Sequence, residues 1–206
     1  MTSPQVVLAS NNAKKLAELR RILEPLIPGI VVLGLSDVAD YPEPPETEPT
    51  FEGNALIKAR AAVTATGLPA LADDSGLCVD ALNGMPGVLS ARWSGVAKAD
   101  GGDSANNALL LSQLSDVPDD RRGARFVCAM ALCAADGTEI IQRGEMTGHI
   151  LRAEQGEGGF GYDPLFAATG FDVSTAELIP ADKDAISHRG RALAAIAPAV
   201  RDALTR

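Results

Sequence analysis

The segment from Arg125 to Ala134 constrains the fold most, because it is densely apolar and its apolar and polar residues barely alternate. This pattern is typical of a central β-strand. The dipeptide Asp136-Gly137 follows, and residues 138–143 then predict an antiparallel partner strand across a tight turn. A sheet containing one hairpin is therefore expected.

The first fifty residues alternate between strand and helix patterns. Residues 5–9 predict a short buried strand, and residues 29–33 predict a second one. Between them, a helix is indicated by four residues at helical spacing: Leu16, Leu19, Leu23 and Leu26. Asn11 or Asn12 is its natural N-cap. Residues 40–49 are rich in Pro and Glu, which predicts a loop.

A second helix is expected from Thr50, as its cap, to about Thr66. Its residues spaced for burial are Phe51, Ala55, Ala59 and Val63. Residues 70–72 predict a strand that ends in the acidic turn Asp73-Asp74-Ser75-Gly76, and residues 77–81 predict another strand.

Helical patterns also cover residues 103–114 and about 182–204, the second one disturbed near Pro198. Residues 174–177 fit a capping box that opens a short helix. Strands interleaved with helices, plus one hairpin, predict an α/β fold with a mixed β-sheet. At 206 residues, without a long linker or an internal repeat, residues 1–206 are expected to form a single domain.

The charge balance narrows the class of partner. The formal net charge of −9 disfavours a nucleic-acid binder, whereas a few well-placed Lys and Arg can still make a pocket for a small anion. We expect no membrane partner, because no apolar stretch is long enough to span a bilayer. The three cysteines form no CxxC pair, Cys128 and Cys133 are expected to be buried thiols, and no signal peptide is visible, which predicts a cytoplasmic protein.

The first candidate binding motif is Ser10-Asn11-Asn12-Ala13-Lys14-Lys15, at the junction of the first strand and the first helix. A helix start offers free backbone N–H groups and the positive end of the helix dipole, which suits phosphate. The alternative interpretation is an ordinary capped surface helix. No Gly-Lys dipeptide occurs, so a Walker A loop is excluded.

Asp73-Asp74-Ser75-Gly76 is the candidate reactive centre. Two adjacent carboxylates raise each other's pKa unless a cation is near, and Mg²⁺ suits one or two carboxylates together with substrate phosphate oxygens. Glu46 is a second candidate ligand. The alternative interpretation is an acidic turn closed by glycine.

Two further motifs suit a nucleotide base. Residues 156–163 contain GxGxxG, but no strand precedes it and Pro164 follows too closely for a dinucleotide fold. A loop that presents Phe160 and Tyr162 for stacking on a base fits better. Ser187-His188-Arg189, preceded by Lys183, supplies donors for a carbonyl oxygen or phosphate, although a charged helix face is the alternative.

In order along the chain, these motifs resemble the inosine-triphosphate pyrophosphatases, a family acting on non-standard purine nucleoside triphosphates. Six segments carry the resemblance: residues 10–15, 51–55, 71–77, 86–92, 158–164 and 187–189. The resemblance implies an elongated mixed β-sheet with flanking helices, two lobes around an active-site cleft, and a homodimer. It also implies Mg²⁺-dependent hydrolysis of ITP, dITP and XTP to the monophosphate and pyrophosphate, which cleanses the nucleotide pool.

The resemblance also implies roles for single residues. Asp74 is the expected catalytic base and a metal ligand, with Glu46 as a further ligand. The expected triphosphate ligands are Ser10, Asn11, Asn12, Ala13, Lys14, Lys15, Lys58 and Arg92, with Ser75 against the substrate. The expected base-binding residues are Phe160, Gly161, Tyr162, Asp163, Lys183, His188 and Arg189.

Three other interpretations remain open at this point. A pyrophosphatase for other modified nucleotides, such as methylated pyrimidines, would share the chemistry. A nucleotide sensor would bind ITP without releasing pyrophosphate. A dinucleotide-dependent oxidoreductase is disfavoured by the surroundings of the glycine-rich loop.

Overall fold

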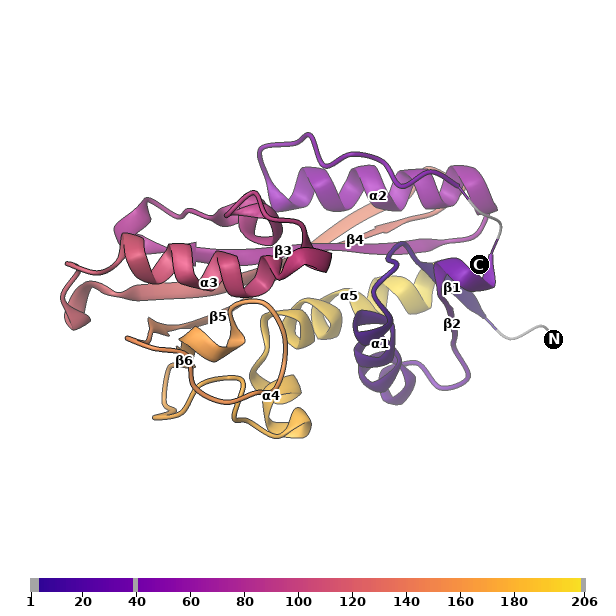
Figure 1. Ribbon diagram of the computed structural model, residues 1–206. Coiled ribbons are helices and arrows are strands. Elements are labelled where there is room, and N and C mark those ends of the chain that lie inside the picture. Colours follow the sequence, from indigo (N-terminus) through magenta and orange to yellow (C-terminus); the bar gives the residue numbers. More distant parts are fainter. Residues whose placement is uncertain (1–3, 39–40, 205–206) are drawn as a thin grey trace. The chain divides into compact units, whose positions relative to one another are not determined.

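The computed structural model describes residues 4–38 and 41–204, and its β-sheet confirms the predicted α/β class. Six strands occur in the order β2-β1-β3-β4-β5-β6 (Figure 1). β1 pairs in parallel with β2 and β3, whereas β5 pairs antiparallel with β6, so the sheet is mixed. The strands are β1 (Gln5–Leu8), β2 (Val31–Leu33), β3 (Ala70–Val79), β4 (Gly123–Cys133), β5 (Glu139–Ile150) and β6 (Phe166–Ala168).

Five α-helices occur among the described residues, and local capping explains where two of them begin. They are α1 (Ala13–Leu26), α2 (Phe51–Thr66), α3 (Gly102–Gln113), α4 (Pro180–Ile186) and α5 (His188–Leu204). The Asn12 side chain accepts a hydrogen bond from the Lys15 N–H at 3.3 Å, and the Thr50 side chain accepts one from Gly53. Both predicted caps are confirmed. No helix in the described part of the chain is long and apolar enough to cross a bilayer.

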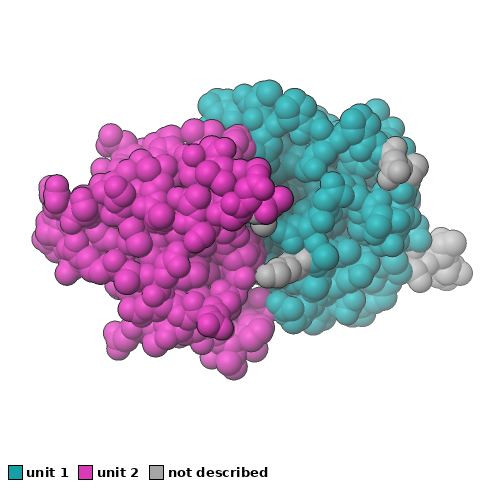
Figure 2. Space-filling model, viewed as in Figure 1, with its two compact units in different colours: residues 1–74, 128–144, 188–206 teal, residues 75–127, 145–187 magenta. Residues whose placement is uncertain are grey.

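The chain divides into two compact units, each assembled from separate stretches of sequence (Figure 2). Unit 1 contains residues 1–74, 128–144 and 188–206, and unit 2 contains residues 75–127 and 145–187. The chain passes from one unit to the other at four points, and three of them lie within strands β3, β4 and β5. Each of these strands therefore belongs partly to unit 1 and partly to unit 2.

The core of unit 1 lies between its strands and the pair α1 and α5. Leu19 and Leu23 of α1 pack with Leu193 and Ile196 of α5 and with strand residues such as Met130. Helix α2 lies on the opposite face of these strands (Figure 1). The predicted helical spacing is confirmed except at its last position, because Leu26 is exposed and its neighbour Ile27 is buried instead.

The core of unit 2 is a separate cluster around α3 and the ends of β4, β5 and β6. Leu110 and Leu114 pack there with Phe126, Leu165 and Phe166. The rings of Phe126 and Phe166 meet edge to face at 4.7 Å between centroids.

Three sequence predictions about element ends were wrong. The Asp73–Gly76 stretch is not a turn between two strands but the interior of β3. The C-terminal helix is interrupted at Ser187, whose extended backbone (ψ 148°) separates α4 from α5. The Ser174 N–H donates the expected hydrogen bond to Glu177 Oε2, but the Ser174 hydroxyl donates to the Gln155 carbonyl, and no helix begins there.

Candidate active site

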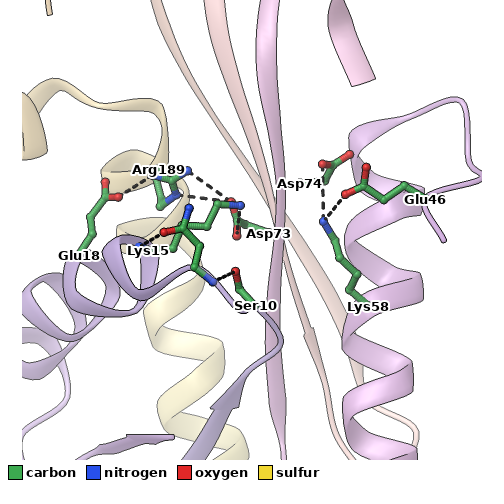
Figure 3. A network of polar contacts seen from close by, with 9 residues as sticks. Ser10, Lys15, Glu18, Glu46, Lys58, Asp73, Asp74 and Arg189 are labelled. Carbon is green, nitrogen blue, oxygen red and sulfur yellow. Dashed lines mark hydrogen bonds and ion pairs between the residues drawn. The ribbon is translucent and has the colours of Figure 1, made fainter. Parts of the chain in front are cut away.

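Asp73 and Asp74 point to opposite faces of β3 (Figure 3). Successive side chains of a strand alternate between its faces, so neighbouring aspartates in a strand interior cannot share one cation. This corrects the expectation of an acidic turn with two adjacent carboxylates around a metal. Each aspartate instead has its own set of partners in unit 1.

Asp74 faces helix α2. Its Oδ2 accepts a hydrogen bond from Asn54 Nδ2 at 3.1 Å, and its Oδ1 lies 3.6 Å from Lys58 Nζ. Lys58 also donates to Glu46 Oε1 at 3.0 Å, so one ammonium group lies between two carboxylates. Asn54, Lys58 and Asp74 are all buried. Sequence segments more than ten residues apart therefore meet in one charged cluster.

Burial and charge shift the acidity of this cluster. Burial raises the pKa of Asp74, and the negative charge of Glu46 adds to the effect, which Lys58 and the hydrogen bond from Asn54 only partly offset. Burial acts to lower the pKa of Lys58, but the surrounding carboxylates outweigh it and raise the pKa. Lys58 therefore stays charged, and Asp74 is a more basic carboxylate than an exposed one.

Asp73 faces α1 and α5. It forms an ion pair with Lys15 Nζ at 2.9 Å and lies 3.5 Å from the guanidinium of Arg189. Arg189 also donates to Glu18 Oε2 at 2.5 Å, and its side chain is buried. Burial alone would raise the pKa of Asp73, yet Lys15 and Arg189 outweigh it and lower the pKa well below its usual value.

The predicted anion motif lies where α1 begins. The Ser10 hydroxyl accepts a hydrogen bond from the Asn12 N–H at 3.2 Å, and the Asn11 side chain donates to Glu43. Lys15 is bound to Asp73, so its ammonium is shared with β3. The side chain of Lys14 lies outside the described part of the structure. A phosphate role for residues 10–15 stays a prediction.

The residues predicted to bind a base fall into both units. In unit 2, Asp163 Oδ2 accepts hydrogen bonds from the Phe160 N–H at 2.8 Å and from Lys183 Nζ at 2.6 Å. The Lys183 ammonium lies 5.7 Å from the centroid of the Phe160 ring. His188 and Arg189 begin α5 in unit 1.

Arg92 and Ser75, the remaining predicted substrate residues, belong to unit 2. Arg92 ends a short 3₁₀ helix, residues 87–92, and is exposed. The Ser90 carbonyl next to it accepts a hydrogen bond from the Tyr162 hydroxyl at 2.9 Å, which joins the Arg92 region to the glycine-rich loop. That loop has no strand directly before it and no α-helix directly after it, so the rejection of a dinucleotide fingerprint is confirmed.

The Asp74 cluster fits a magnesium ion by the chemistry of its donors. Asp74 and Glu46 place two carboxylates around one ammonium, and Mg²⁺ takes one or two protein carboxylates together with water and phosphate oxygens. No group of three or more His, Cys, Asp or Glu side chains with metal-binding geometry occurs among residues 4–38 and 41–204. A closed all-protein cage of the kind that binds structural zinc is therefore not formed by these residues.

Sequence reasoning missed two residues of these clusters. Asn54 holds Asp74 and also accepts a hydrogen bond from the Glu48 N–H at 2.9 Å. It lies in a segment that carried the family resemblance, which was the available signal. Glu18 is one turn after Lys15 on α1, but its partner Arg189 is 171 residues away, and no local pattern predicts that contact.

Together, the fold and these clusters define an α/β protein with a buried lysine placed between two carboxylates. The chain belongs to the Ham1 family, whose family model matches residues 6–199. The family resemblance predicted from the six sequence motifs is thereby confirmed.

Individual relatives agree with this assignment. A dITP/XTP pyrophosphatase from Nocardia farcinica is 64% identical over 201 residues, covering 97% of this chain and 96% of the relative. A crystal structure of a nucleoside-triphosphatase (dITP/XTP pyrophosphatase) from Mycobacterium abscessus is 57% identical, with a TM-score of 0.77 over 94% of this chain and 99% of its own. A HAM1 protein from Coxiella burnetii has a TM-score of 0.84 at 41% identity, covering 97% of this chain and 99% of its own.

Proposed function

We propose that this protein hydrolyses ITP, dITP and XTP to the monophosphate and pyrophosphate, with Mg²⁺ as cofactor. The observation that carries the proposal is Asp74, a buried carboxylate with a raised pKa beside Glu46 and Lys58. The names of the Nocardia and Mycobacterium relatives support the substrate class.

Asp74 acts as the general base. A carboxylate with a raised pKa takes a proton more readily, and here it would take one from the water that attacks the α-phosphorus. Asn54 fixes the carboxylate through Oδ2, which leaves Oδ1 on the side of Lys58. Asp74 and Glu46 would hold Mg²⁺, which when bound neutralises phosphate charge and orients the leaving pyrophosphate.

The triphosphate would be bound by cations and by the start of α1. Lys58 and Lys15 lie on opposite faces of β3, and Arg92 is exposed in unit 2. Their charges would stabilise the charge that develops on pyrophosphate as it leaves.

The base would be recognised by residues 160–163, Lys183, His188 and Arg189. Stacking on Phe160 is tolerant of base identity, so selectivity needs polar donors facing the 6-oxo group of hypoxanthine or xanthine. Adenine carries an amine there and would leave these donors unpaired.

His188→Ala is therefore expected to narrow the preference for ITP over ATP, measured as the ratio of their kcat/KM values. If this ratio were unchanged, His188 would be structural.

The test is pyrophosphate release from ITP, dITP, XTP, GTP, ATP and dTTP, with Mg²⁺ and with a chelator. We expect release from the first three only, and only with the metal. Release from dTTP, a methylated pyrimidine nucleotide, in place of the purine substrates would overturn the proposed substrate class, and binding of ITP without release would overturn the proposed hydrolysis. We further propose a cytoplasmic homodimer, which sedimentation analysis of the purified protein and fractionation of cells would test.

A further inference from the structure

Helix α3 carries two consecutive buried amides, Asn106 and Asn107, with exposed fractions of 2% and 3%. Successive residues of an α-helix leave its axis about 100° apart, so the two side chains reach different segments of unit 2. A buried amide loses its hydration and needs protein partners.

Asn106 holds the segment around Arg92. Its Oδ1 accepts a hydrogen bond from the Ser94 N–H at 2.7 Å, and its Nδ2 donates to the Ser90 carbonyl at 3.3 Å. These two backbone groups lie on either side of Arg92, whose own side chain is exposed. One amide therefore fixes the backbone on both sides of an exposed cation. We call residues 90–94 the Arg92 segment.

Asn107 holds the glycine-rich loop. Its Nδ2 donates to the Gly161 carbonyl at 3.2 Å and to Glu154 Oε1 at 2.8 Å, and because both partners are acceptors the orientation of the amide is fixed. Asp103, one turn earlier on α3, accepts from the Gly161 N–H at 3.1 Å. Gly161, between Phe160 and Tyr162, has a left-handed backbone (φ 60°) that is bound through both its N–H and its C=O.

Stability alone does not account for an amide at position 107. Its Oδ1 is buried and has no hydrogen-bond partner in the described part of the structure. An unmet buried acceptor destabilises a fold, and an apolar side chain of similar shape would avoid that cost. What an apolar side chain would not supply is the hydrogen bond to Gly161.

We propose that Asn106 and Asn107 are positioning residues for the two ends of the bound nucleotide. Asn106 sets the Arg92 segment for the triphosphate, and Asn107 with Asp103 sets Phe160 and Tyr162 for the base. This inference rests on the proposed function, which assigns Arg92 and residues 160–163 to those two ends.

The test compares the near-isosteric variants Asn106→Asp and Asn107→Asp with the exposed control Ser112→Ala on the same helix. In Asn107→Asp a carboxylate opposes the Gly161 carbonyl and Glu154, so we expect the ITP/ATP ratio of kcat/KM to fall on the order of tenfold or more. Asn106→Asp keeps the Ser94 contact and loses the Ser90 one, so we expect a lower kcat for ITP and ATP alike with their ratio unchanged. Ser112→Ala should match wild type in both.

Trp93 supplies a readout that does not depend on turnover. It is the single tryptophan of the chain, it lies in the Arg92 segment, and its Nε1 donates to Gln113 of α3 at 2.9 Å. Its emission should shift more in unliganded Asn106→Asp than in Asn107→Asp, which reaches the Arg92 segment only through the hydrogen bond between Tyr162 and Ser90. Quenching of Trp93 by ITP and by ATP then gives the base preference of each variant in binding alone.

An unchanged ITP/ATP ratio in folded Asn107→Asp, or an equal loss of ratio in both variants, would overturn the inference. If either aspartate variant fails to fold, Asp103→Ala, at a half-buried position, removes the other contact to Gly161 and must lower the same ratio. If wild type releases no pyrophosphate, the proposed function fails. The positioning roles are then tested by binding alone: they are supported if Asn107→Asp loses the preference for ITP over ATP measured by Trp93 quenching, and they are overturned if it keeps this preference.

Discussion

Asp73 neutralises a buried guanidinium, so its charge contributes to stability rather than to reaction chemistry. In Asp73→Asn, Arg189 stays buried, keeps its contact with Glu18 and loses the charge of Asp73. Breaking such a pair leaves buried charge uncompensated, and we expect a loss of about 3–5 kcal/mol in the free energy of unfolding. Urea unfolding measures it, with the exposed Asp172→Asn as a charge-matched control that should change little.

The pH dependence of that loss has a defined sign. The pKa of Asp73 is lowered in the fold, so its stabilisation is complete above the unfolded value of about 3.9 and is lost as pH falls toward the folded value. The difference between wild type and Asp73→Asn should therefore stay constant from pH 7 to about 5 and shrink below about 4. A difference that already shrinks near pH 6 would contradict the ion-pair assignment.

The ionisation of Asp74 affects stability in the opposite direction to that of Asp73. Its pKa is raised in the fold, so the ionised carboxylate at neutral pH weakens the folded state relative to the protonated one. We expect Asp74→Asn to lose on the order of hundredfold in ITP turnover while its thermal midpoint at pH 7 equals or exceeds that of wild type. Near-wild-type turnover would remove Asp74 from the chemistry, and a clear loss of stability would make it structural.

Part of the candidate site could be predicted from sequence because its residues lie in short, recognisable segments. Lys15 and Asp74 lie in two such segments, and Lys58 lies three residues beyond a third, residues 51–55. The separation of the two aspartates could not be predicted, because Asp-Asp-Ser-Gly favours a turn locally and Arg189, a partner of Asp73, lies far along the chain. The amides of α3 were missed for the same reason, since their partners are backbone groups of distant loops.

At the scale of elements, the contact between β5 and α5 has no room for a side chain. A Cβ on Gly144 would overlap the His188 carbonyl oxygen and would lie 2.6 Å from the Ala192 nitrogen. Gly144→Ala must push the start of α5 away from the strand, and we expect a loss of about 1–3 kcal/mol. Chemical denaturation checks this, with Gln142→Ala on the same strand as control; equal stabilities of the two variants would show that α5 adapts freely.

The elements with strong local signals were predicted correctly, as the Asn12 and Thr50 caps illustrate. The break between α4 and α5 was not, although Ser187 is a residue type that favours the position before a helix. The helical periodicity of residues 182–204 concealed it, because both helices contribute to one continuous pattern. Similarly, local turn propensity concealed that β3 continues through Gly76 to Val79.

Unit 1 is assembled from three separate stretches of the chain, so we expect the first stretch not to fold without the other two. A fragment of residues 1–127 lacks Met130, Leu132 and every core residue of α5, including Leu193 and Ile196. The strands and α1 would then expose apolar surface that nothing in the fragment covers. We expect the fragment to show no cooperative thermal transition and little near-UV circular dichroism. A sharp transition would mean that residues 1–127 hold a core of their own.

The alternation of Asp73 and Asp74 across β3 also limits how this strand can evolve. Inserting or deleting a single residue between Ala70 and Asp73 would move each later side chain to the other face. Asp73 would then lie on the face of Lys58 and α2, and Asp74 would lie on the face of Arg189, α1 and α5. We therefore expect this strand to tolerate single side-chain replacements better than a one-residue change in its length.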